Sequence, residues 1–245
     1  MGCRRQRRPP ARAGARSLAV SRRRDTLPHA VTPRETWLVL GAIGRVLRDS
    51  TRIDDIHLVA DITGRDRFEK LLEAIRARPD GADLLARRPT LGPDDVDLPT
   101  LRRLSPDTLG GAFARHLDRH GLELYEGPPS DRYLTDPDAR YLVHRYRQMH
   151  DIWHVLLGLG TEGHEEVLVH AFTLGHLRLP NSALIVLFGS LKHMVLEGRW
   201  HALTHDLWGG YRRGREAGDL LAVRWETRWA DPIDEVRRDV GVRAL

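Results

Sequence analysis

The stretch "MHDIWHVLLGLGTEGHEEVLVHAF", residues 149–172, contains two helical segments joined by a glycine-rich turn. Apolar residues recur at helical spacing on both sides of that turn. Gly158 and Gly160 are helix stop signals, and Thr161 is suited to cap the start of the second helix. The stretch therefore predicts an antiparallel helical hairpin.

Four polar side chains of this hairpin are expected to converge. His150 and His154 are four residues apart, so they share one face of the first helix, and Asp151 falls in the same arc. His154 lies four residues before Gly158, and Glu166 lies five residues after Thr161. Because the two helices are antiparallel and rise equally per residue, these two positions lie at a similar distance from the turn and so face each other. Imidazole and carboxylate groups bind divalent ions, and zinc is the expected ion, although iron, manganese and cobalt accept the same ligands.

The remaining polar residues of the stretch are expected to play lesser parts. His170 lies one helical turn beyond Glu166. It is predicted to contact a metal ligand without binding the metal itself. His164 and Glu165 are expected to face solvent. Two histidines four residues apart are also common on ordinary helix surfaces, so the metal prediction depends on Asp151 and Glu166 lying at compatible positions.

Helical periodicity continues along nearly the whole chain from Pro33 onward, and no alternation is long enough to build a sheet. We therefore predict an all-α fold, with residues 31–245 forming a single multi-helix domain whose metal site lies in a helical hairpin. The segment "NSALIVLFGSLKHMVLEGRW", residues 181–200, is apolar on almost every side. This is typical of a fully buried core helix and also of a wall for an apolar slot.

The positive charge of the chain is concentrated at its N-terminus. The formal net charge is +5, but nine arginines and no acid fall within residues 1–24. Residues 1–30 are therefore expected to be a disordered, arginine-rich extension, with a transit peptide or a lipid anchor as alternatives. The rest of the chain is near neutral, so we expect no nucleic-acid partner. The single cysteine, Cys3, excludes an intramolecular disulfide and a thiolate zinc cluster.

The amino-acid composition also gives an expectation of where in the cell the protein is found. Arginine accounts for all but two of the 39 basic residues, a bias typical of a GC-rich genome. This favours a bacterial cytoplasmic protein, with the matrix side of the mitochondrial inner membrane as the alternative. No apolar run approaches the roughly 18–20 residues needed to cross a bilayer, so any membrane contact is expected to be peripheral.

The ligand spacing and its surroundings resemble those of a known family. The pattern HDxxH followed by eleven residues and Glu resembles the metal motif of the coenzyme Q (ubiquinone) biosynthesis protein 4 family. Further blocks are similar to that family in the same order: "ARRPTL" (86–91), "LPTLRRLSPDTLGGAFARHLDRHGL" (98–122), "YLVHRYRQMHDIWHVLLG" (141–158) and "WETRWADPIDEVRRDVGV" (225–242). One departure is "RLPN" at 178–181, where the family shows glycine-leucine-proline-methionine.

The resemblance implies an all-α domain with bound zinc that acts in ubiquinone assembly. It implies metal-dependent, oxidative decarboxylation at C1 of a 4-hydroxy-3-methoxy-5-polyprenylbenzoate head group, with His150, Asp151, His154 and Glu166 acting through the metal. The alternative is a non-catalytic scaffold that binds prenyl lipid and the other ubiquinone biosynthesis proteins, and a homodimer stays open. Arg145 could contact the substrate carboxylate, or could simply form an ion pair.

Overall fold

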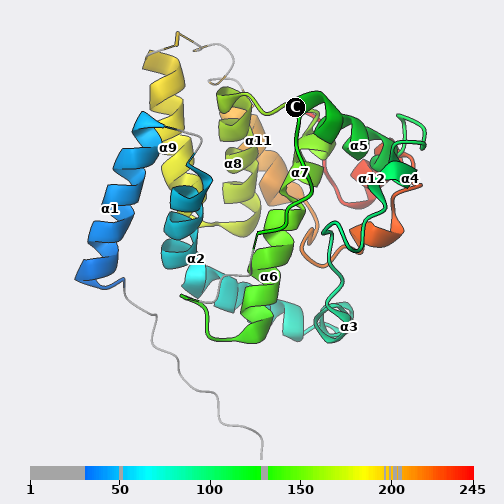
Figure 1. Ribbon diagram of the computed structural model, residues 1–245, viewed down its shortest axis with the longest axis horizontal. Coiled ribbons are helices and arrows are strands. Elements are labelled where there is room, and N and C mark those ends of the chain that lie inside the picture. Colours follow the sequence, from blue (N-terminus) through cyan, green and yellow to red (C-terminus); the bar gives the residue numbers. More distant parts are fainter. Residues whose placement is uncertain are drawn as a thin grey trace, which may run out of the picture.

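The structure of the protein is a computed structural model, which describes residues 31–49, 52–127, 132–195, 197–198, 200, 203 and 206–245. Within these ranges there is no β-sheet, only an isolated bridge between Thr108 and Pro232, so the predicted all-α fold is confirmed. The predicted arginine-rich extension, residues 1–30, lies outside the described residues. The helices, labelled in Figure 1, are α1 (Pro33–Arg48), α2 (Ile53–Arg76), α3 (Pro79–Arg87), α4 (Leu98–Leu101), α5 (Leu109–His120), α6 (Pro137–Gln148), α7 (His150–Leu157), α8 (Gly163–Leu177), α9 (Pro180–Val195), α11 (Asp206–Glu216) and α12 (Ile233–Asp239), with a 3-10 turn η1 at Trp225–Thr227.

Helix α7 is the most deeply packed element near the predicted site. It lies between α5 and α8, as Figure 1 shows. Ile152, Trp153, Leu156 and Leu157 are each at most 1% exposed. Burial of one such side chain contributes about 1.5–3 kcal/mol, so these four residues hold the backbone of the histidine-bearing helix in the core.

Helices α8 and α11 approach each other through a pair of glycines. A Cβ at Gly214 would lie 2.0 Å from the carbonyl oxygen of Phe172, and one at Gly175 would lie 2.1 Å from that of Tyr211. Both neighbours are backbone atoms, so a side chain at either position would force the helices apart. The glycine pair therefore sets the spacing of these two helices.

We expect Gly214→Ala to lower the free energy of unfolding by about 2 kcal/mol, within the usual cost of overpacking a core contact. Gly218→Ala is the matched control, because a Cβ there would lie 3.5 Å from the nearest atom, which is ordinary contact. Urea unfolding of both variants tests this expectation. Equal stabilities for the two alanine variants would show that the helices separate at no cost.

Helix α1 is held on α2 by a small apolar cluster and by ion pairs. Val39 and Ala42 pack on Val59 of α2, and Leu184 of α9 contacts the same cluster. At the start of α1, the Glu35 carboxylate accepts hydrogen bonds from Arg65 at 2.9 and 3.2 Å. Hydrogen bonding to Arg65 lowers the pKa of Glu35 to about 2, so this carboxylate stays ionised at any ordinary pH.

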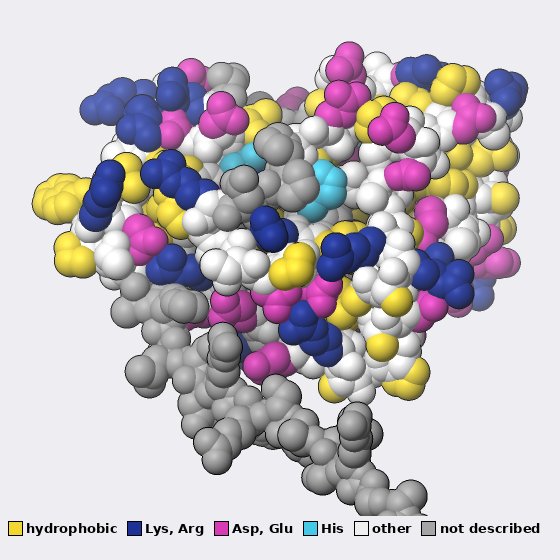
Figure 2. All heavy atoms as spheres, turned by 60° about the horizontal axis from the view of Figure 1, so that its bottom comes forward, with side chains coloured by type: hydrophobic (Ala, Val, Ile, Leu, Met, Phe, Trp, Pro, Cys, Tyr) yellow, Lys and Arg dark blue, Asp and Glu magenta, His cyan; other side chains and the backbone are white. Residues whose placement is uncertain are grey.

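The outer surfaces of α1 and α9 are partly apolar. On α9, Leu187 and Leu191 are 62% and 58% exposed, and on α1 Trp37 is 75% exposed. The expectation of a fully buried core helix at 181–200 is therefore wrong for the outer face of α9. Across the face seen in Figure 2, Lys and Arg side chains are interspersed with Asp and Glu. Among the described residues, such side chains often form ion pairs, as Arg76 does with Asp138.

No helix among the described residues combines the length and the apolar character needed to span a membrane.

Candidate metal centre

The predicted hairpin is formed by α7, a short turn and α8. Helix α7 ends at Gly158, whose φ of 74° places it in the left-handed region that favours glycine. Helix α8 is capped by Glu162 and not by Thr161, so the predicted cap is wrong by one residue. The Thr161 hydroxyl instead lies 3.0 Å from Nδ1 of His120 on α5. The turn is therefore attached to a third helix.

Glu165 fixes this turn, contrary to the expectation that it faces solvent. One carboxylate oxygen accepts a hydrogen bond from the N–H of Gly160 at 2.8 Å, and the other accepts one from the N–H of Glu162 at 3.1 Å. Glu162 and Glu165 form a capping box at the start of α8. The sequence signal was weak because a capping box usually begins with Ser or Thr, whereas this one begins with Glu.

Three of the four predicted ligand residues come together close to the turn of the hairpin. His154 Nε2 lies 3.2 Å from His150 Nε2 and 3.4 Å from Glu166 Oε1. His150 Nε2 lies 3.4 Å from Glu166 Oε2. Each imidazole thus faces one oxygen of the same carboxylate, and the three ligand atoms lie within 4.8 Å of one another.

The orientation of His154 is set by the turn. Its Nδ1 lies 2.7 Å from the carbonyl oxygen of Gly160. A carbonyl can only accept, so Nδ1 carries the proton and Nε2 presents its lone pair toward His150 and Glu166. Metal-binding histidines are commonly oriented in this way by a carbonyl on the other ring nitrogen. His154 is completely buried, which holds the ring in this position.

The spacing and chemistry of the group fit a divalent ion. Ligand atoms around one tetrahedral ion, with bonds of about 2.0–2.2 Å, lie roughly 3.3–3.5 Å apart, and each imidazole lies at about that distance from the other imidazole and from one oxygen of Glu166. With one ligand atom taken from each residue, the three atoms lie within 4.8 Å of one another. With its proton on Nδ1, His154 offers a lone pair here, and the Glu166 carboxylate offers two more acceptor oxygens, so a proton on His150 or a bound cation stabilises the group. Two imidazoles and a carboxylate suit zinc, as well as iron, manganese or cobalt.

Burial and mutual contact shift the pKa values in this group. Burial raises the pKa of Glu166, but the side-chain contacts and charges of His150 and His154 outweigh it and place that pKa well below its usual value. Burial lowers the pKa of His150, but the hydrogen bond and charge of Glu166 outweigh it and raise that pKa. The group therefore holds a proton strongly when no ion is bound, and a metal must displace that proton.

Asp151, the fourth predicted ligand, contributes no atom to this group. Neighbouring residues on a helix differ by about 100° in direction, so Asp151 and His150 do not lie on the same line along α7. Burial raises the pKa of Asp151, while the charges of His150 and His154 lower it, so its carboxyl lies within electrostatic reach of the ligands. Its role as a ligand stays a prediction.

His170 lies beside the group, where the sequence placed it. Its ring centre is 5.7 Å from that of His150, and its Nδ1 lies 3.2 Å from the hydroxyl of Ser182 on α9. Burial, together with the charge of His150, lowers the pKa of His170 to about 3, so this ring is neutral. Its contribution to metal binding stays a prediction.

Sequence reasoning missed two histidines of α5. The ring of His116 is centred 5.4 Å from that of His154 and 4.8 Å from that of His120. Burial lowers the pKa of His116 to about 4. Both residues lie four positions apart in "ARHLDRHG", the same spacing as His150 and His154, so this pattern was the available signal.

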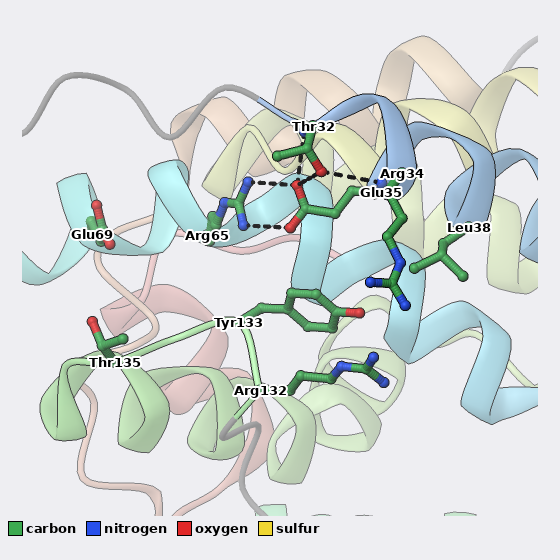
Figure 3. Close-up of a pocket in the computed structure, with 9 residues that line it drawn as sticks. All are labelled: Thr32, Arg34, Glu35, Leu38, Arg65, Glu69, Arg132, Tyr133 and Thr135. Atoms are coloured by element: carbon green, nitrogen blue, oxygen red, sulfur yellow. Dashed lines mark hydrogen bonds and ion pairs between the residues drawn. The ribbon is translucent and has the colours of Figure 1, made fainter.

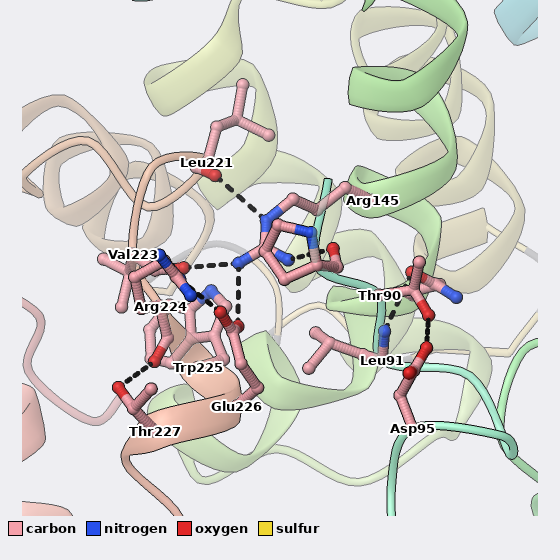
Figure 4. A network of polar contacts seen from close by, with 12 residues as sticks. Thr90, Leu91, Asp95, Arg145, Leu221, Val223, Arg224, Trp225, Glu226 and Thr227 are labelled. Atoms are coloured by element: carbon pink, nitrogen blue, oxygen red, sulfur yellow. Dashed lines mark hydrogen bonds and ion pairs between the residues drawn. The ribbon is translucent and has the colours of Figure 1, made fainter. Parts of the chain in front are cut away.

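Arg145, expected from the sequence either to contact substrate or to form an ion pair, is fully buried on α6. Figure 4 shows its guanidinium donating to the carbonyl oxygens of Leu221 and Val223, at 3.3 and 2.6 Å. It also donates to the carbonyl of Pro89 at 2.9 Å and pairs with Glu226 at 3.2 Å. These contacts tie α6 to the C-terminal segment, so ion pairing and backbone binding account for this residue.

Comparison with known proteins identifies relatives that match most of the length of this chain. The family model for coenzyme Q (ubiquinone) biosynthesis protein Coq4 matches residues 26–245. The chain is 29% identical over 209 residues to the ubiquinone biosynthesis protein COQ4 homolog, mitochondrial, of Bos taurus, covering 85% of this chain and 78% of that protein. It is 33% identical over 210 residues to the corresponding mitochondrial protein of Pyrenophora tritici-repentis, covering 84% and 70%.

A solved structure shows the same fold. The crystal structure of a protein assigned to ubiquinone biosynthesis from Nostoc punctiforme aligns with a TM-score of 0.68 and 25% sequence identity. The alignment covers 85% of this chain and 99% of that one. The arrangement of helices is therefore shared with an experimentally determined protein.

Proposed function

The chain belongs to the family of coenzyme Q (ubiquinone) biosynthesis protein Coq4 and so has a role in ubiquinone biosynthesis, and on that basis we propose a specific reaction. The proposed substrate is a 4-hydroxy-3-methoxy-5-polyprenylbenzoate, and the proposed reaction is removal of its C1 carboxyl at the metal centre. The observation that carries this proposal is the three-residue ligand group of His150, His154 and Glu166. Catalytic zinc sites typically keep one position open beside three protein ligands, whereas structural sites close all four.

A divalent ion held by these three residues would act as a Lewis acid that orients the carboxylate or phenolate of the substrate. The para hydroxyl of the head group pushes electron density onto C1, so a proton can add there, and loss of carbon dioxide then restores the aromatic ring. That sequence involves no net oxidation. Replacement of the carboxyl by hydroxyl would in addition need an external oxidant, because zinc has no redox chemistry.

The chain's own groups support this chemistry by their positions. The Gly160 carbonyl keeps the lone pair of His154 aimed at the ion site, since it accepts the Nδ1 proton. Asp151 has a pKa raised by burial, which suits it to hold a proton close to the ligands. The apolar side chains of α9, which begin next to Ser182 beside His170, provide a surface along which a prenyl chain can extend.

A scaffold function is the second candidate, and a specific feature favours it. Trp37 on α1 and Leu187, Leu191 and Val195 on α9 leave apolar surface exposed at the edge of the molecule. Exposed apolar patches commonly mark contacts with proteins or lipids. The scaffold would bind prenyl lipid and other ubiquinone biosynthesis proteins, at a peripheral membrane location, and its metal would serve stability.

The two candidates are separated by the quinone intermediates of a strain that lacks this protein. We expect Glu166→Gln to leave the carboxylated head group accumulating, while the partner biosynthetic enzymes still co-purify with the variant. Glu123→Gln is the matched control, because Glu123 is exposed and far from the ligands in sequence. Normal ubiquinone levels with a metal-free Glu166→Gln protein would rule out the enzyme and leave the scaffold.

A further inference from the structure

A second site lies away from the metal ligands, at the start of α1. A cavity of about 440 Å³, open to solvent on one side, is lined by α1, α2 and the residues that lead into α6. None of the three metal-ligand residues lines this cavity. Its basic residues are Arg34, Arg65 and Arg132, and its acidic residues are Glu35 and Glu69, which leaves an excess of one positive charge. Figure 3 shows its lining, with Tyr133 at the centre.

One of the three guanidinium groups is already neutralised. Arg65 forms an ion pair with Glu35 at 2.9 Å, and both side chains are largely buried. Glu35 also accepts hydrogen bonds from the N–H and the hydroxyl of Thr32, at 2.8 and 2.9 Å. Its oxygens are thus occupied by Arg65 and by the cap of α1, so Glu35 does not serve as counter-ion for the other arginines.

The other two guanidinium groups have no carboxylate partner among the residues that the structure describes. Arg34 comes from the first turn of α1, and Arg132 lies over the ring of Tyr133, 5.4 Å from its centre. In Figure 3 both groups point into the same space. Two positive charges held on one side of a cavity repel each other, and an anion between them removes that repulsion.

Tyr133 adds an unsatisfied polar atom at the same place. Its hydroxyl is buried and has no hydrogen-bond partner within the described part of the chain. In Figure 3 this hydroxyl lies between the two guanidinium groups. A buried hydroxyl without a partner is unfavourable, and an oxygen of a ligand in the cavity would accept its proton.

We propose that this cavity binds the phosphate group of a phosphomonoester or diphosphate, through Arg34, Arg132 and the hydroxyl of Tyr133. Guanidinium groups bind phosphate through paired hydrogen bonds. A phosphate carries nearly two negative charges at neutral pH and offers three oxygens, which matches two arginines and a hydroxyl, whereas a carboxylate offers one charge and two oxygens. Leu38, on the same wall, gives apolar contact for the organic part of the ligand.

Titration of the full-length protein with pyrophosphate by calorimetry, at about 0.15 M salt where exposed charges are screened, tests the site. We expect the double variant Arg34→Gln/Arg132→Gln to bind pyrophosphate at least tenfold more weakly than wild type. Arg119→Gln/Arg243→Gln is the matched control, because it removes the same charge from two exposed arginines outside the cavity. Thermal melts of both double variants show whether they fold like wild type. Tyr133→Phe should weaken binding to a smaller degree.

A second arm separates a soluble ligand from a lipid head group. Vesicles containing phosphatidic acid present the same phosphate group at a surface, and vesicles of phosphatidylcholine alone serve as reference. Loss of pyrophosphate binding in the cavity variant alone supports a soluble ligand, and loss confined to phosphatidic-acid vesicles supports a lipid head group. Failure of wild type to bind either probe, or equal losses in both double variants, would overturn the proposal.

Discussion

Glu166→Gln should lower the affinity of the purified protein for zinc by about a hundredfold or more, with no change in helix content. The carboxylate is the only anionic member of the three-residue group and contacts both imidazoles. Mutation of a residue that only supports a metal ligand typically lowers metal affinity by about 10- to 100-fold. Loss of a ligand itself should therefore lower the affinity by more than that. Metal content by plasma mass spectrometry, and a competition titration with a chelator, measure the effect.

The same titration has a predicted pH dependence. The raised pKa of His150 means that this ring gains a proton as the pH falls through that pKa, and a protonated imidazole cannot bind a metal. Zinc affinity of the wild type should therefore fall as the pH is lowered. Glu123→Gln should retain full metal content and the same pH profile. Retention of one zinc per chain by the Glu166→Gln protein would show that the ion binds elsewhere.

Arg145→Met should lower the free energy of unfolding by about 3 kcal/mol, a larger loss than the one expected for Gly214→Ala. Arg145 is fully buried, and its removal takes the donor from the carbonyl oxygens of Leu221 and Val223, whereas Glu226 keeps its ion pair with Arg224. A buried acceptor left without a hydrogen bond typically costs about 1–3 kcal/mol, so the loss of two such bonds is expected to cost about 3 kcal/mol. Urea unfolding measures the loss.

Arg102→Met is the matched control, since Arg102 forms an ion pair with Asp118 at 2.7 Å in which both side chains are 47% exposed. Solvent screens such a pair, so this variant should unfold like wild type. A stability loss of equal size in the two variants would contradict the structural role assigned to Arg145. Metal content should stay unchanged in Arg145→Met protein that remains folded, because Arg145 contacts none of the ligand residues.

The features that sequence predicted correctly are those set by short-range geometry. The four-residue spacing of His150 and His154 places both on one face of any helix, whatever surrounds it. Gly158 ends the helix because it adopts a positive φ, which is a local property of glycine. The helical character of the chain follows from the same kind of short-range periodicity. These signals were enough to predict an all-α fold and a hairpin that brings Glu166 to the histidines.

Other details of the site depend on small angular differences within the hairpin. Asp151 was assigned to the same arc as the histidines, and it contributes no atom to the group of three, so its role as a ligand stays a prediction. The cap of α8 lies at Glu162, and Glu165 closes the turn through two backbone N–H groups. The prediction of turns is less exact because several polar residues compete for the same N–H groups.

By itself, the sequence determined the helices, the turn between them and the three side chains that meet there, because each depends on residues close together in the chain. Only the tertiary structure decided which distant segments lie beside them. His116 approaches His154 from α5, and Arg145 binds carbonyls that are 76 and 78 residues further along the chain. The cavity at Arg34 and Arg132 likewise depends on how α1 packs on α2. Such contacts arise from the packing of whole helices, which no local spacing in the chain encodes.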